Sequence, residues 1–150
     1  MTVFVQVEDF DMGAQLNKLR LASPSIGALV SFVGQVRDIN DGDSINTLTL
    51  EHYPGMTESA LQAIEAEAKS RWDILDSLII HRVGTLKPLD QIVLVAVVSA
   101  HRGEAFKACE FIMDFLKTQA PFWKKEVTSL GERWVDAKQS DDLALKQWQK

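Results

Sequence analysis

The stretch that decides the fold class is Leu78-Ile79-Ile80-His81-Arg82-Val83, followed after a turn over residues 84–90 by Ile92-Val93-Leu94-Val95-Ala96-Val97-Val98-Ser99. Both segments are rich in β-branched residues and have the length of buried strands, so we expect two consecutive strands. Parallel strands are joined by long crossovers, usually helical, and this connection is too short for a helix. The stretch therefore argues against a purely parallel, doubly wound sheet.

The flanking segments alternate between strand and helix patterns. A polar loop over residues 37–44 interrupts them, and Pro121 must end the helix that precedes it. Strands are predicted at 2–7, 27–36, 45–51 and 134–137, and helices at 12–19, from an N-cap at Thr57 to about 71, at 103–118 and at 141–148. The order β-α-β-β-α-β-β-α with a β-rich tail predicts an α+β fold with a mixed or antiparallel sheet, as a single domain over residues 1–150.

Composition excludes several classes of protein. The net charge of −5 argues against a nucleic-acid binder, and no apolar run approaches the roughly 20 residues that span a bilayer. The start of the chain has no basic leader and Cys109 is the only cysteine, so we expect a cytoplasmic protein without disulfides. The three histidines are far apart and lack paired-ligand spacing, so no metal site is expected.

A basic cluster occupies the second half of the chain. Residues 101–138 carry seven Lys and Arg against six Asp and Glu, which suggests a small anionic ligand. Lys117 ends an apolar helix, and Lys124 follows the Pro121 turn. The ordinary explanation is that Lys117 interacts favourably with the dipole at the end of its helix and that Lys124 is a solvated surface residue. If the loop instead brings the two ammonium groups together, their repulsion would lower a lysine pKa and free an amine for nucleophilic or general-base chemistry.

Other charged residues have both a functional and a structural explanation. His101 and Arg102 begin the long helix, where free N–H groups and a guanidinium favour an anion; the alternative is a capping histidine and a solvated arginine. Arg37, after a predicted strand, could reach the same anion. His81 lies within a strand, which favours a structural or interface role, and Cys109 lies on an apolar helix face as a core residue.

Several separate blocks, in order over about residues 28–138, resemble the catalytic (large) subunit of molybdopterin synthase. Several blocks in the right order are far more specific than any single motif. They are Gly34-Gln35-Val36-Arg37, Leu48-Thr49-Leu50-Glu51-His52-Tyr53-Pro54-Gly55-Met56, His81-Arg82-Val83-Gly84, Ser99-Ala100-His101-Arg102, and Phe111-Ile112-Met113-Asp114-Phe115-Leu116-Lys117 running into Ala120-Pro121-Phe122-Trp123-Lys124-Lys125-Glu126.

The resemblance implies an α/β hammerhead-type fold with a small extra β subdomain. It implies a sulfurtransferase of molybdenum cofactor biosynthesis that converts cyclic pyranopterin monophosphate to the dithiolene of molybdopterin. A homodimer would form the centre of a heterotetramer, with a small ubiquitin-like sulfur carrier at each end. The carrier's Gly-Gly tail would carry the sulfur as a C-terminal thiocarboxylate, so no metal or organic cofactor is implied.

The resemblance also assigns residues to roles. It implies Lys117 and Lys124 as catalytic residues. The implied substrate-binding set is Gln35, Val36, Arg37, His101, Arg102, Lys117, Lys124, Lys125 and Glu126. Two positions depart from the family: Lys138 stands where some members have arginine, and Leu89 lies in a turn where glycine is common.

Two other functions remain open from the sequence. A non-catalytic module could use the basic cluster only to bind the tail of a ubiquitin-like partner. An enzyme acting on a phosphate ester without any protein partner is the other alternative. The sequence also leaves open the order of the two sulfur transfers, the individual roles of the two lysines, and whether one protomer contributes residues to the site of the other.

Overall fold

The centre of the molecule is a four-stranded mixed sheet. The computed structural model describes residues 1–135 and 139–149. The strand order is β1 (Thr2–Gln6), β5 (Asp76–Arg82), β7 (Gln91–Ser99) and β2 (Ala28–Gln35). β1 runs parallel to β5, whereas β7 is antiparallel to both β5 and β2. The predicted α+β class with a mixed sheet is confirmed.

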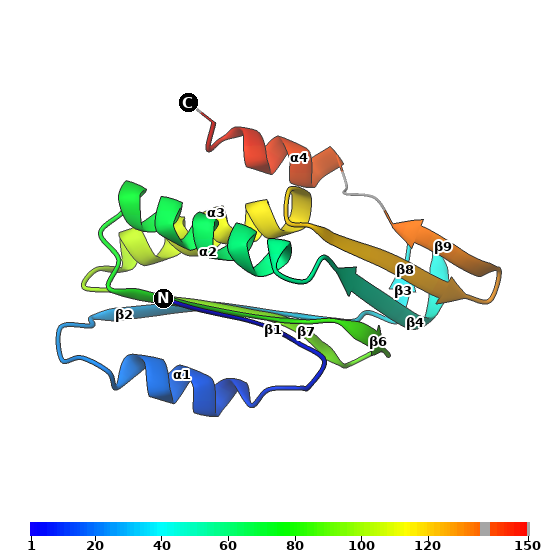
Figure 1. Ribbon diagram of the computed structural model, residues 1–150, viewed down its shortest axis with the longest axis horizontal. Coiled ribbons are helices and arrows are strands. Elements are labelled where there is room, and N and C mark those ends of the chain that lie inside the picture. Colours follow the sequence, from blue (N-terminus) through cyan, green and yellow to red (C-terminus); the bar gives the residue numbers. More distant parts are fainter. Residues whose placement is uncertain (136–138, 150) are drawn as a thin grey trace.

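Helices cover both faces of this sheet (Figure 1), with α1 (Met12–Arg20) on one face and α2 (Met56–Arg71) and α3 (Arg102–Thr118) on the other. Alternate side chains of β7 therefore enter two different cores. Val93, Val95 and Val97 pack in the α2–α3 core. Leu94, Ala96 and Val98 pack in the core that includes Phe10 and Leu19. Burial on both faces explains why β7 is a continuous apolar run in the sequence.

A second sheet forms the small extra β subdomain. It contains, in order, β3 (Ile39–Asn40), β4 (Asp43–His52), β8 (Phe122–Thr128) and β9 (Gly131–Val135). The short strand β6 (Gly84–Leu86) pairs with β4 on the side away from β8. Its small core consists of Val36, Ile45, Leu48, Leu50 and Leu86. The predicted 37–44 loop therefore contains β3 and the start of β4, and the predicted 84–90 turn contains β6.

The prediction that Thr57 caps α2 was wrong. The helix begins at Met56 with Gly55 at the N-cap position, where φ is +85° and glycine is favoured. Thr57 is fully buried, and its hydroxyl accepts from the Tyr53 N–H at 3.0 Å and donates to the Pro121 carbonyl at 3.0 Å. The threonine thus ties the start of α2 to the turn between α3 and β8.

The C-terminal helix α4 (Gln139–Lys146) packs against α3. Trp148 anchors it, because the indole Nε1 donates to Asp114 Oδ2 at 2.6 Å and the Trp148 carbonyl accepts from Arg71 at 2.6 Å. Ala137, the predicted end of the last strand, and Lys138 lie outside the described residues. Across residues 1–135 and 139–149, no helix has the length and apolar character needed to cross a membrane.

Candidate active site

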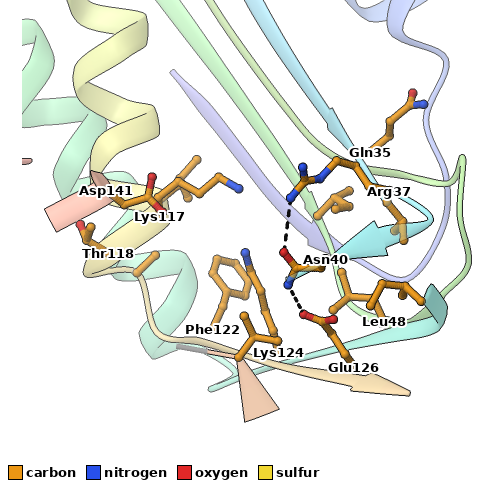
Figure 2. Close-up of a pocket in the computed structure, with 16 residues that line it drawn as sticks. Gln35, Arg37, Asn40, Leu48, Lys117, Thr118, Phe122, Lys124, Glu126 and Asp141 are labelled. Atoms are coloured by element: carbon orange, nitrogen blue, oxygen red, sulfur yellow. Dashed lines mark hydrogen bonds between the residues drawn. The ribbon is translucent and has the colours of Figure 1, made fainter. Parts of the chain in front are cut away.

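A cleft of about 330 Å³ opens between the C-terminal end of α3, the β2–β3 segment and β8. Figure 2 shows Lys117 entering from the α3 side, Arg37 and Asn40 on the opposite side, and Phe122 and Lys124 between them. Of the residues that the sequence suggested for substrate binding, the structure brings six together in the lining: Gln35, Val36, Arg37, Lys117, Lys124 and Glu126.

The strand β8 decides which of its basic residues face the cleft. α3 ends at Thr118, and β8 begins at Phe122 after the Pro121 turn, so Lys117 and Lys124 belong to different elements. Successive side chains of a strand point to opposite faces, which puts Lys124 and Glu126 in the cleft. Lys125 points away, with its Nζ 3.9 Å from Glu132 Oε2 and 5.8 Å from the centroid of the Trp134 ring.

An aromatic stack supports the floor of the cleft. The ring of Phe122 lies on the imidazole of His81, with centroids 3.8 Å apart and planes 17° apart. His81 is buried, and its Nδ1 lies 2.8 Å from the Arg82 carbonyl. Burial lowers the pKa of His81 to about 3, and the charges of Lys124 and Lys117 act in the same direction. His81 is therefore neutral at physiological pH and packs under the cleft, in agreement with the structural role expected from its strand.

Glu126 is bound within the protein. Its side chain is 3% exposed. Its Oε1 accepts from Asn40 Nδ2 at 2.5 Å and its Oε2 lies 3.3 Å from Arg133 Nη2. Arg133 also contacts Asp43 Oδ2 at 2.6 Å. A buried carboxylate is tolerated only when its charge and lone pairs are matched, and these contacts do so.

His101 and Arg102 do not reach this cleft. Both are exposed at the N-terminal end of α3, where His101 occupies the N-cap position without a capping bond from its side chain to any described residue. Lys117 lies fifteen residues further along the same helix, which corresponds to about 22 Å at 1.5 Å per residue. Within one protomer, the two ends of α3 cannot contact one small ligand.

Asn40 and Phe122 are among the lining residues that the sequence did not suggest as part of a site. Asn40 lies in the segment that was predicted as a polar loop, and a single asparagine there carries no signal for a site. Phe122 belongs to a block quoted for the family resemblance, yet only the packing shows it as the floor of the cleft.

Cys109 lies in the core formed with α2 and α3 and does not line the cleft. Cys109 is 4% exposed, and burial raises the pKa of its thiol to about 12, so the reactive thiolate is suppressed. In the described part of the chain, no three His, Cys, Asp or Glu side chains gather in a way that would hold a metal ion.

Comparison with known proteins identifies the family. The family model described as "MoaE protein" matches residues 5–119. The chain belongs to the MoaE family. It is 62% identical over 147 residues to the "Molybdopterin synthase catalytic subunit" of Ralstonia nicotianae, a match that covers 98% of this chain and 84% of that protein.

Solved structures agree with the family in fold. The MoaE protein of Burkholderia ambifaria superposes with a TM-score of 0.84 at 58% identity, covering 98% of this chain and 97% of its own. A complex of subunits 1 and 2 of the molybdopterin-converting factor of Helicobacter pylori matches with a TM-score of 0.69, covering 92% of this chain and 90% of the solved chain. At 20% identity, that second likeness concerns the fold alone.

Proposed function

We propose that this protein is the catalytic subunit of a molybdopterin synthase and transfers sulfur to a pterin phosphate. The observation that carries the proposal is the cleft of a MoaE-family chain in which Arg37, Lys117 and Lys124 surround the apolar ring of Phe122. Basic side chains suit a phosphate and a developing oxyanion, and an aromatic floor suits a flat heterocycle. Relatives with more than half of their residues identical bear the name of this enzyme.

Within this proposal, Arg37 binds the phosphate of cyclic pyranopterin monophosphate. A guanidinium offers a planar fork of N–H donors that matches phosphate oxygens. Gln35 and Val36 lead into Arg37 along the same wall of the cleft, so they fix the approach of the substrate from that side. Lys125 and Glu126 support the arrangement indirectly, because Lys125 faces away and Glu126 is bound to Asn40 and Arg133.

Lys117 and Lys124 perform the chemistry in this proposal. The sulfur donor is the C-terminal thiocarboxylate of a small ubiquitin-like carrier, whose Gly-Gly tail reaches the cleft. In these roles the two amines exchange protons with the reacting sulfur and pterin, or one of them, in its neutral form, attacks the carrier's acyl carbon. That attack forms an amide bond while the C–S bond breaks and the sulfur leaves with the pterin. The lysine that keeps its proton stabilises the oxyanion that forms at that carbon.

We also propose a homodimer at the centre of a heterotetramer, in the cytoplasm. The support is geometric: His101 and Arg102 belong to the substrate-binding set implied by the resemblance, yet they lie a helix length from Lys117. A second protomer that presents the N-terminal end of its α3 to the cleft would complete the anion site. In a two-fold dimer, both clefts are completed in the same way.

A reconstituted reaction tests the function. The protein is mixed with cyclic pyranopterin monophosphate and carrier that ends in either a thiocarboxylate or an ordinary carboxylate, and molybdopterin is measured by the fluorescence of its oxidised derivative. Product only with thiocarboxylated carrier is expected. A stable complex with the carrier but no product would indicate a binding module, and turnover of the pterin phosphate without carrier would indicate a different phosphate-ester enzyme.

A further inference from the structure

We propose that Asn40 is a positioning residue that keeps the charge of Arg37 available for the substrate's phosphate by standing between Arg37 and the buried carboxylate of Glu126. The inference rests on the proposed function of the cleft and adds to it a residue that determines affinity for the anion. Figure 2 shows the three side chains in a row, with Asn40 in the middle.

The hydrogen bonds give the Asn40 amide a defined orientation. Its Nδ2 donates to Glu126 Oε1 at 2.5 Å, and an ionised carboxylate can only accept. The amide oxygen is therefore on the opposite side, where it accepts from Arg37 Nη2 at 3.4 Å. If the amide were flipped, its N–H group would face the N–H donors of Arg37 and its oxygen would face the carboxylate of Glu126. Both contacts would be repulsive.

The backbone of Asn40 is fixed as well. Asn40 pairs with Asp43 in the short β3–β4 ladder, and its carbonyl accepts from Arg133 Nη2 at 2.9 Å. The same guanidinium contacts Asp43 Oδ2 at 2.6 Å and Glu126 Oε2 at 3.3 Å. Arg133 thus neutralises Glu126 and holds the residue that contacts Arg37, so Asn40 cannot move without breaking several contacts.

A neutral spacer has a consequence for charge. An arginine in direct contact with a carboxylate forms a bidentate pair and loses much of its attraction for another anion. Arg37 contacts the amide oxygen of Asn40 instead, and among the ion pairs of the described residues none involves Arg37. The exposed guanidinium is held at the cleft with its charge free for a phosphate.

Calorimetric titration of the purified protein with inorganic phosphate tests the inference. Asn40→Ala removes the acceptor of Arg37 and is expected to weaken phosphate binding about fivefold, the value of one ordinary hydrogen bond. Asn40→Asp places a carboxylate on Arg37 and is expected to weaken binding at least tenfold. Arg37→Ala gives the limit of the effect.

Asn17→Asp is the matched control. Asn17 Oδ1 also accepts from an arginine, the Nε of Arg20 at 3.2 Å, but on the exposed helix α1 outside the cleft. The same change of charge there should leave phosphate affinity within twofold of wild type. In the reconstituted reaction, the Asn40 variants should raise KM for the pterin phosphate in the same ratio and leave kcat nearly unchanged.

Equal phosphate affinity in wild type, Asn40→Ala and Asn40→Asp would overturn the inference. The inference would also be overturned if phosphate affinity fell only in proportion to melting temperature and Asn40→Asp bound phosphate no more weakly than Asn40→Ala. That pattern is expected of a residue with a purely structural role. The function is judged separately by molybdopterin formation. If molybdopterin forms but the Asn40 substitutions leave phosphate affinity unchanged, only the inference is contradicted. If the substitutions weaken phosphate binding but no molybdopterin forms, only the proposed function is contradicted.

Discussion

The imidazole of His81 and the phenyl ring of Phe122 stack with their centroids 3.8 Å apart. The contact joins the C-terminal end of β5 in the central sheet to the first residue of β8, and therefore joins the buried core to the floor of the cleft. A charged imidazole in that place would be buried and would face the charges of Lys124 and Lys117. The stack therefore depends on a neutral His81.

Acid should weaken the fold through His81. The pKa of His81 is lowered from its ordinary 6.5 to about 3 in the folded protein, so the unfolded chain binds the additional proton between these values. The stability contributed by the neutral His81 is complete above pH 6.5 and is lost as pH falls toward 3. The loss amounts to about 2–3 kcal/mol at pH 4.5. In urea unfolding, His81→Phe, which keeps a ring but does not titrate, should be about 2–3 kcal/mol more stable relative to wild type at pH 4.5 than at pH 7. An identical pH dependence in the variant would contradict it.

Glu65 should produce the opposite dependence. The carboxyl is 1% exposed and accepts from Ser77 Oγ at 2.5 Å. Burial raises its pKa from 4.5 to about 7, despite that hydrogen bond. The stability contributed by the protonated Glu65 is complete below pH 4.5 and is lost as pH rises through 7. The full loss is about 3 kcal/mol. Glu65→Gln should remove this loss in urea unfolding between pH 5 and 8.

Glu67→Gln is the control for Glu65. Glu67 lies on the same helix but is exposed, so Glu67→Gln leaves the buried carboxyl of Glu65 in place and should keep the loss of stability between pH 5 and 8. Between pH 4.5 and 6.5 the His81 and Glu65 contributions have opposite slopes. In that range the free energy of unfolding of wild type should therefore change less with pH than that of His81→Phe or Glu65→Gln. A wild-type pH dependence as steep as that of the two variants would contradict this explanation.

The turn before β7 contains a strained residue at Leu89. Its φ is +78°, its side chain is 78% exposed, and the strain of a left-handed leucine costs about 1–2 kcal/mol. Leu130 is a comparable turn leucine, 82% exposed, without a positive φ. Because glycine itself costs about 0.5–1 kcal/mol in flexibility, Leu89→Gly should be more stable than Leu130→Gly by about 1–2 kcal/mol. Equal melting temperatures would show that the turn is not strained.

A complementation experiment tests the shared site. If the cleft of one protomer uses His101 and Arg102 of another, homodimers of Lys117→Ala and of Arg102→Ala are both impaired. Subunit exchange between them should create mixed dimers with one intact cleft and restore up to about a quarter of wild-type molybdopterin formation, since half of the dimers are mixed and each has one of two sites. Activity that stays at the level of the separate variants after verified exchange would place both residues in one protomer's site or outside it.

The sequence predicted the parts of the fold that carry a local pattern. β5, β7 and α3 were recognised because they are long, apolar segments whose burial is visible residue by residue. β8 was not recognised as a strand, since its Lys124-Lys125-Glu126 run looks solvated and its strand conformation comes from pairing with β4, more than 60 residues earlier. β3 and β6 are too short for any periodicity.

The same limit applies to the cleft. The residue pattern and the family resemblance both pointed to Lys117, Lys124 and Arg37. The resemblance also implied Lys125, which alternation along β8 turns away from the cleft toward Glu132 and Trp134. Asn40 contacts Arg37 only three residues away, yet its other partner, Glu126, is 86 residues distant. Only the folded sheet, in which β3 and β8 both pair with β4, reveals that partnership.

The measurement that tests the central claim most directly is molybdopterin formation by Lys117→Ala with thiocarboxylated carrier. Lys107→Ala is the matched control, because Lys107 lies on the same helix but is exposed and does not line the cleft. Loss of a positioned acid, base or nucleophile should reduce turnover at least about 100-fold in Lys117→Ala and leave Lys107→Ala near wild type. Wild-type turnover by Lys117→Ala would contradict the assignment of this cleft as the active site.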